Sequence, residues 1–268
     1  MSNPGRCDVS VPEPVGGPDL ARAKPASIRT SSSVTPRGLS TPAMTPFEAQ
    51  RHEICRIGRS LFERGLVHAS AGNISVRLPD AQGFLITPTD ACLGFLEPDQ
   101  LAHVGVDAGP QDATPTGPRA SKTLALHRAI YAAEPQAHCV IHTHSTHLVA
   151  LTLAGVWRTD CILPPITPYF VMKVGRVPLI PYHRPGDPAV AQAVATLIES
   201  ARARGAPIRA VMLERLGPNV WHESPAAAMA ALEELEETAR LWLMGGRQAA
   251  PLSSAQLDEL HSAFGVRW

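Results

Sequence analysis

Apolar side chains recur every three or four residues in several stretches of the chain, a spacing that places them on one face of a helix. Ile54, Ile57 and Leu61 form the first row, and Gly65 predicts the end of that helix. Ser224 precedes the longest row and belongs to the residue types that cap helix N-termini. The pattern predicts helices over residues 46–64, 121–131, 148–153, 188–198, 225–244 and 254–264.

Shorter apolar runs without helical spacing predict strands. They cover residues 74–78, 84–86, 139–142, 177–180 and 210–213. Helices and strands are interleaved, but some strands follow one another directly, which is not the pattern of a purely parallel sheet. We therefore predict an α/β fold of one domain, in which a mixed central β-sheet is covered by helices on both sides.

The run that begins at Cys139 leads directly into His142 and His144. Residues two apart on a strand project to the same side, so both imidazoles can reach one point at the strand end. Neutral imidazole is a common ligand of zinc and similar metals. The spacing alone leaves two interpretations open: a pair of metal ligands, or two hydrogen-bonded histidines at a strand terminus.

Residues 1–44 differ from the rest of the chain, because they are rich in Pro, Ser, Gly and Arg and have no periodic apolar pattern. Such a composition cannot bury enough apolar surface to offset chain entropy. We predict a disordered extension over 1–44 and one folded domain over 45–268. A targeting or docking role for the extension is the alternative interpretation.

The formal net charge is zero, which argues against a nucleic-acid partner. No apolar run approaches the roughly 18 residues of a spanning helix, so we expect no membrane association. The five cysteines are dispersed without a paired motif, and the N-terminus lacks the apolar segment of a secretory signal. Reduced thiols of this kind indicate a cytoplasmic protein.

Several motifs occur in a fixed order: Gly72-Asn73-Ile74-Ser75, Ile86-Thr87-Pro88-Thr89, Ser121-Lys122, His142-Thr143-His144 and a turn at Gly217. In this order and spacing, residues 46–245 resemble the class II aldolase family of fuculose-phosphate aldolases and adducin head domains. The stretches 163–169, 185–188 and 233–239 are more similar to the branch of 3-oxo-tetronate 4-phosphate decarboxylases.

The resemblance implies a zinc-dependent lyase in which three histidines hold the metal and a glutamate approaches it. The zinc ion stabilises the enediolate that forms when the substrate loses carbon dioxide, and a tyrosine then protonates it to give dihydroxyacetone phosphate. His142 and His144 match two zinc ligands, and Tyr169 matches the proton donor. The positions that match the phosphate site are Asn73, Thr89, Asp90, Ser121 and Lys122. The family also implies a homotetramer.

Two positions depart from the family pattern. Thr123 stands where the family has its glutamate, and Leu216 stands where it has the third zinc histidine. Glu214 and His222 are near enough in sequence to be considered as substitute ligands. The alternative to a working lyase is therefore a catalytically impaired or non-catalytic member with a binding or scaffold role. A redox reaction with two-histidine iron is a third interpretation.

Overall fold

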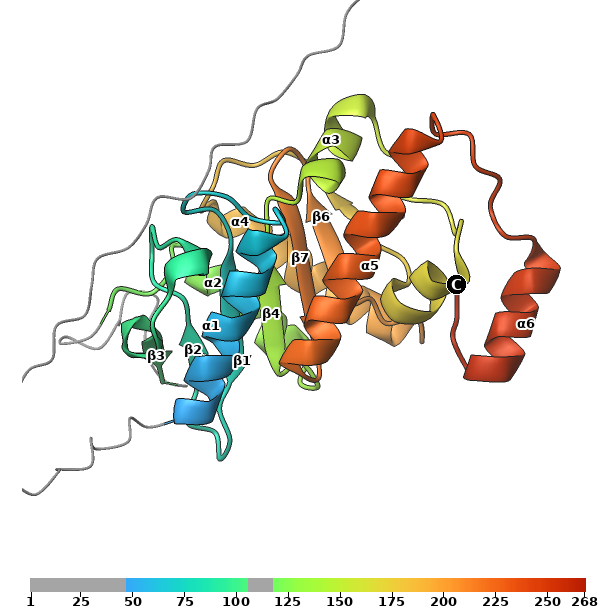
Figure 1. Cartoon of the computed structure of the whole chain (residues 1–268). Coiled ribbons are helices and arrows are strands. Elements are labelled where there is room, and N and C mark those ends of the chain that lie inside the picture. The colour runs from blue at the N-terminus through green and yellow to red at the C-terminus, as the bar shows by residue number, and fades with distance from the viewer. Residues whose placement is uncertain (1–46, 106–117) are drawn as a thin grey trace, which may run out of the picture. The chain divides into compact units, whose positions relative to one another are not determined.

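The computed structural model describes residues 47–105 and 118–268, so the predicted extension over 1–44 lies outside the described residues (Figure 1). Seven strands form one sheet in the order β3-β2-β1-β4-β7-β6-β5. Only β5 and β6 pair in parallel, and the other neighbouring strands are antiparallel. The strands are β1 Asn73–Arg77, β2 Phe84–Ile86, β3 Ala102–Val104, β4 Cys139–His142, β5 Leu179–Ile180, β6 Ala210–Leu213 and β7 Gly217–His222.

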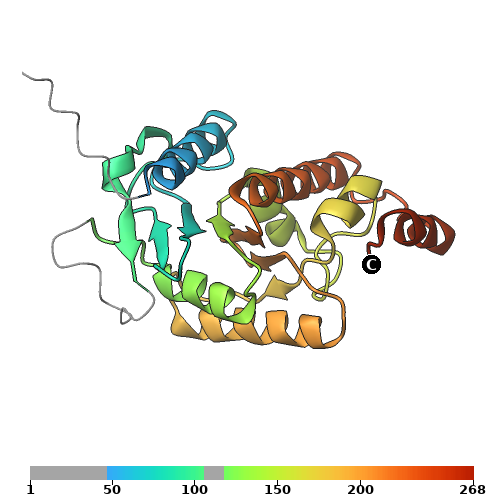
Figure 2. The ribbon, with the colours of Figure 1, turned by 90° about the horizontal axis from the view of Figure 1, so that it is seen from below.

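Helices cover both faces of this sheet, as Figure 2 shows from below. One face carries α1, α3 and α5, and the other carries α2 and α4. The α-helices are α1 Glu48–Glu63, α2 Leu124–Ala133, α3 Thr146–Ala154, α4 Pro188–Ala203, α5 Pro225–Met244 and α6 Ser254–Phe264. Three short helical segments are η1 Leu93–Phe95, η2 Pro98–Gln100 and η3 Phe170–Val174. The predicted fold class is confirmed.

Successive side chains of β4 point alternately into the two apolar layers on either side of the sheet. Ile141 points into the layer under α1, α3 and α5, whereas Val140 points into the layer under α2 and α4. His142 follows in the same alternation and therefore faces α2 and α4. Its cross-strand neighbours are Asn73 on β1 and Asn219 on β7. A short row of polar side chains thus lies at one end of an otherwise apolar layer.

The structure corrects several predicted boundaries. The helix predicted over 121–131 begins later, at Leu124, with Thr123 in the capping position. Strand β3 was not predicted, and neither was β7, whose first residues 217–219 have the composition of a turn. By contrast, Ser224 caps α5 as predicted, and Asp187 caps α4 in the same way, each accepting a backbone N–H of the first turn.

Within the two described ranges, no helix is long and apolar enough to cross a membrane.

Candidate active site

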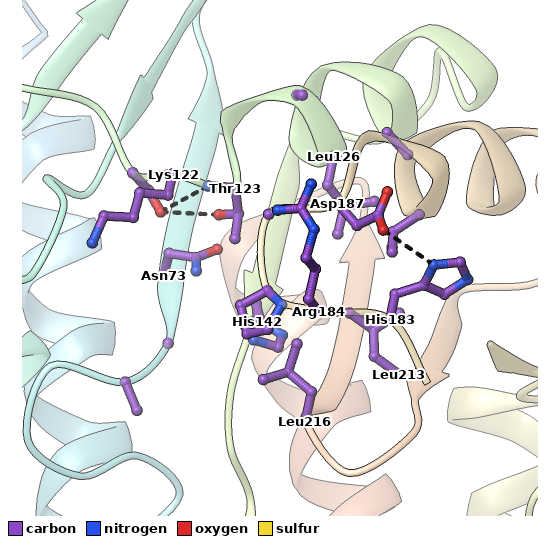
Figure 3. A pocket seen from close by; sticks show the side chains of 18 of the residues that line it. Asn73, Lys122, Thr123, Leu126, His142, His183, Arg184, Asp187, Leu213 and Leu216 are labelled. Carbon is purple, nitrogen blue, oxygen red and sulfur yellow. Dashed lines mark hydrogen bonds and ion pairs between the residues drawn. The ribbon is translucent and has the colours of Figure 1, made fainter. Parts of the chain in front are cut away.

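A cavity of about 280 Å³ lies where β4 ends, between the loop before β1, the start of α2 and the turn that joins β6 to β7 (Figure 3). The loop before α4 closes another side. Eight of the nine residues predicted for the site line this cavity: Asn73, Thr89, Asp90, Ser121, Lys122, Thr123, His142 and His144. Residues spread over some seventy positions of sequence are therefore brought to one place by the fold.

The histidine pair is held in a defined orientation. The rings of His142 and His144 have centroids 5.1 Å apart and stand nearly perpendicular to each other. His142 donates its Nδ1–H to the carbonyl oxygen of Pro218 at 2.9 Å. A neutral imidazole carries one N–H, so this hydrogen bond leaves the Nε2 lone pair of His142 free for a ligand. Such backbone anchoring of the other ring nitrogen is typical of metal-binding histidines.

Burial keeps this pair uncharged at neutral pH. It lowers the pKa of His142 to about 4, with a further contribution from His144. The pKa of His144 is also lowered, first by burial and then by the nearby His68. Both side chains are therefore lone-pair donors rather than cations when the pH is near 7.

Polar and cationic groups gather on the wall formed by the start of α2. The Nζ of Lys122 lies 3.1 Å from a carboxylate oxygen of Asp90, and both side chains are exposed. Ser121 and Thr123 share a hydrogen bond of 2.9 Å between their hydroxyl oxygens. Hydroxyls, an amide from Asn73 and an ammonium group are the donors that recognise a phosphate.

The donor set does not fit the three-histidine zinc site that the family resemblance implies. Leu216 lines the cavity next to His142, and its side chain cannot bind a metal ion (Figure 3). Thr123, which the resemblance places at the position of the family's glutamate, lines the cavity with a hydroxyl and not a carboxylate. Across residues 47–105 and 118–268, no group of three His, Cys, Asp or Glu side chains is placed to hold a metal ion. A catalytic zinc ion normally has three protein ligands, so we assign no chemical step to zinc.

Neither of the two substitutes considered from the sequence replaces the missing ligand. Glu214 lines the cavity, but one of its carboxylate oxygens accepts the backbone N–H of Tyr182 at 2.9 Å, and among the described residues Glu214 forms no group of three possible metal ligands with the histidine pair. His222 pairs with Cys139, at the opposite end of β4 from His142. His222 is therefore excluded from the site by the register of the sheet.

Tyr169 is the one predicted site residue that lies elsewhere. Its side chain is 62% exposed and lines a separate groove with His147 and Lys173. Within a single chain, Tyr169 does not reach the cavity that holds the histidine pair.

The structure also adds residues that the sequence did not single out. Arg184 and His183 line the cavity from the loop before α4 (Figure 3). The Nδ1 of His183 lies 3.7 Å from a carboxylate oxygen of Asp187. Arg184 faces the cavity and is its second cation beside Lys122. The signal was present in the turn Pro185-Gly186-Asp187, which fixes the loop, but the preceding residues carry no motif of their own.

Comparisons with known proteins identify the family of this chain. Residues 52–243 match the family described as Class II Aldolase and Adducin N-terminal domain. The chain is 58% identical over 223 residues to a protein of Cupriavidus necator named 3-oxo-tetronate 4-phosphate decarboxylase, covering 81% of this chain and 97% of that protein. A protein of the same name from Escherichia coli K12 is 39% identical over 216 residues, with 80% and 96% covered.

Solved structures of aldolase-like proteins are also similar to this chain. The crystal structure of YgbL from Escherichia coli, titled a putative aldolase/epimerase/decarboxylase, superposes with a TM-score of 0.70 at 40% identity and covers 79% of this chain and 97% of that one. An L-fuculose 1-phosphate aldolase shares the fold with a TM-score of 0.65 at 19% identity, covering 80% of this chain and 95% of its own. The chain is therefore a member of the class II aldolase and adducin N-terminal domain family, similar to its decarboxylase branch.

Proposed function

We propose that this protein is a lyase that decarboxylates a 3-oxo-tetronate 4-phosphate to dihydroxyacetone phosphate and carbon dioxide. The observation that carries the proposal is the 58% identity to a relative of that name over nearly its whole length. The cavity supports it, because the histidine pair and the side chains expected to bind phosphate all line it.

The reaction breaks the bond between the carboxylate carbon and C2 of the substrate. The electron pair that remains moves into the adjacent 3-oxo group, and a proton added at C2 completes the product. The negative charge that develops on the 3-oxo oxygen is stabilised by nearby cations and N–H donors. Lys122 and Arg184 are the cations that line the cavity.

Apolar side chains beside the histidine pair suit the departing group. Leu126, Leu213 and Leu216 line the cavity together with His142 and His144. An apolar wall solvates a carboxylate poorly, whereas it accepts neutral carbon dioxide. We propose that the substrate carboxylate lies against this wall and that the phosphate lies near Asn73, Thr89, Asp90, Ser121 and Lys122. The Nε2 of His142 can accept a hydrogen bond from the substrate's 2-hydroxyl group.

A direct assay tests the proposal. The purified protein is incubated with the stereoisomers of 3-oxo-tetronate 4-phosphate, with and without added zinc or manganese, while carbon dioxide and dihydroxyacetone phosphate are measured. Turnover of at least one isomer is expected. His142→Ala should abolish it, and His52→Ala, which alters an exposed histidine of α1, should not. A protein that is inert towards every isomer under all metal conditions contradicts the proposal.

The alternative of a non-catalytic member was based on Thr123 and Leu216. The comparisons do not support it, because the most similar proteins named above carry the name of a working decarboxylase. Thr123 lines the cavity, so we propose that its hydroxyl contacts the substrate instead of acting as an acid or base.

We further propose a cytoplasmic homotetramer in which Tyr169 serves the cavity of a neighbouring subunit and donates the proton at C2. The exposure of Tyr169 and its place outside its own cavity support this arrangement. Mixing of Tyr169→Phe and His142→Ala subunits tests it: each variant alone should be inactive, and subunit exchange should restore part of the activity. No recovery, with tetramers shown by light scattering, contradicts it.

A further inference from the structure

A chain of four buried polar side chains runs beneath the cavity. The Tyr131 hydroxyl lies 2.9 Å from Ser75 Oγ, and Ser75 Oγ lies 2.7 Å from Nδ1 of His127. The other ring nitrogen of His127, Nε2, lies 2.5 Å from Oδ1 of Asn73. All four side chains are buried, and Asn73 lines the cavity. These four hydrogen-bonded side chains therefore connect the apolar layer under α2 to the site.

Tyr131, at the end of the network away from the cavity, determines which group donates in each hydrogen bond. Among the described residues, the Tyr131 hydroxyl oxygen meets the backbone N–H of Val140, which can only donate, and Ser75 Oγ, which can also accept. If each side chain donated to the next in the direction from Asn73 to Tyr131, the buried phenol proton would have no acceptor. Leaving a buried donor unpaired is costly. The hydroxyl of Tyr131 therefore donates to Ser75, and Ser75 donates to Nδ1 of His127.

The histidine passes this direction on to the amide. Burial lowers the pKa of His127 to about 3, so the ring is neutral and carries a single N–H. Because Nδ1 accepts from Ser75, the proton resides on Nε2 and is donated to Oδ1 of Asn73. The NH2 group of the amide is then the part of Asn73 that remains for the cavity.

We propose that His127 is a positioning residue that locks the Asn73 amide with its NH2 group towards the cavity, as a dedicated donor to an anionic group of the ligand. That this anion is the substrate phosphate rests on the proposed function. The orientation excludes the flipped amide, which would turn a carbonyl oxygen towards the anion. The network thus favours anionic ligands at this wall of the cavity.

The tautomer of His127 is a direct measurement that does not depend on activity. In a spectrum of the 15N-histidine-labelled protein, His127 should be protonated at Nε2 and not at Nδ1 between pH 5 and pH 8. His142 is an internal reference, because it donates from Nδ1 to Pro218 and should show the opposite tautomer. Protonation of His127 at Nδ1 overturns the proposal.

Kinetics of three variants test the consequence for the ligand. His127→Met replaces the ring by an apolar side chain that cannot donate to Asn73, so the KM of the phosphorylated substrate should rise at least tenfold with kcat within about threefold. His127→Gln can place an amide N–H near the position of Nε2 and should recover most of the KM. Asn73→Asp should raise KM a hundredfold or more. Equal KM values for the Met and Gln variants overturn the proposal.

Titration with inorganic phosphate separates this proposal from the proposed reaction. The side-chain NH2 signals of Asn73 should shift as phosphate binds to the wild-type protein, and His127→Met should bind phosphate at least tenfold more weakly. If phosphate shifts these signals while no carbon dioxide is released from any substrate, the decarboxylase function fails and the positioning role stands. If phosphate leaves the signals unchanged in an active enzyme, the positioning role fails.

Discussion

His142 donates its Nδ1–H to the carbonyl oxygen of Pro218 at 2.9 Å, and this bond joins β4 to β7 beside the cavity. The bond fixes the ring and turns Nε2 towards the cavity. The pair formed with His144 supplies two imidazoles to the cavity, and the apolar side chain of Leu216 lies beside them (Figure 3).

Leu216→His should create the missing ligand. A third imidazole next to the existing pair completes the set that catalytic zinc sites use, so the zinc affinity of the variant should exceed that of the wild-type protein at least tenfold. Competition with a chromogenic chelator measures this. Leu153→His on the exposed side of α3 is the matched control and should leave the affinity unchanged. Equal affinities for the wild-type and Leu216→His proteins would show that position 216 does not face the metal.

Stability should fall as the pH falls from 6.5 towards 4. Burial lowers the pKa of His127 to about 3 and that of His142 to about 4, both below the ordinary value of 6.5. In this window the unfolded chain binds protons that the folded chain does not, so each histidine lowers the free energy of unfolding by about 2 kcal/mol at pH 5.

Urea unfolding at pH 7 and pH 5 measures this loss. His127→Gln removes one of the buried histidines that titrate in this window and should reduce the difference between the two pH values by about 2 kcal/mol. His52→Gln, at an exposed position of α1, should keep the wild-type difference. An unchanged difference in His127→Gln contradicts the assignment.

Asn219→Val should stabilise the protein. Both amide atoms of Asn219 are fully buried and have no hydrogen-bond partner among the described residues. An unpaired buried polar group costs about 1–3 kcal/mol, and valine also suits a central strand such as β7. The free energy of unfolding should rise by an amount of that order in urea denaturation. A less stable variant would indicate that the amide is paired through a buried water molecule.

Glu236→Ala should destabilise the protein through α3. The buried Glu236 carboxylate accepts the backbone N–H groups of His147 and Leu148 at 2.9 and 3.1 Å, so it caps the first turn of that helix. Its removal leaves these donors unpaired, at a cost of about 1–3 kcal/mol in urea unfolding. Glu237→Ala breaks an exposed ion pair with Arg240 and should cost less than about 0.5 kcal/mol. Similar losses for both variants would exclude the capping role.

Most of the fold could be predicted because the apolar pattern and the helix caps agree. Asp187 and Ser224, for example, precede helices whose apolar rows are unambiguous. Strand β7 escaped prediction because its first residues are Gly217, Pro218 and Asn219, which locally favour a turn. Pairing with β4 on one side and β6 on the other overrides that preference.

The candidate site was predictable only in part. Eight predicted residues converge on the cavity, since six of them belong to motifs with a recognisable order and Asp90 and Thr123 directly follow two of these motifs. Arg184 carries no such motif, and its place in the cavity depends on how the loop before α4 folds back over the sheet. The hydrogen bond from His127 to Asn73 joins residues 54 positions apart, and no local pattern encodes such a contact.

Gly217 has a φ of 144°, and a Cβ added there would overlap the carbonyl oxygen of Thr143. The backbone at the start of β7 is therefore locked against the segment between the two histidines. The side chain at position 216 is next to this backbone contact and takes no part in it. A substitution at position 216 therefore changes the metal affinity of the cavity while the backbone around it keeps its conformation.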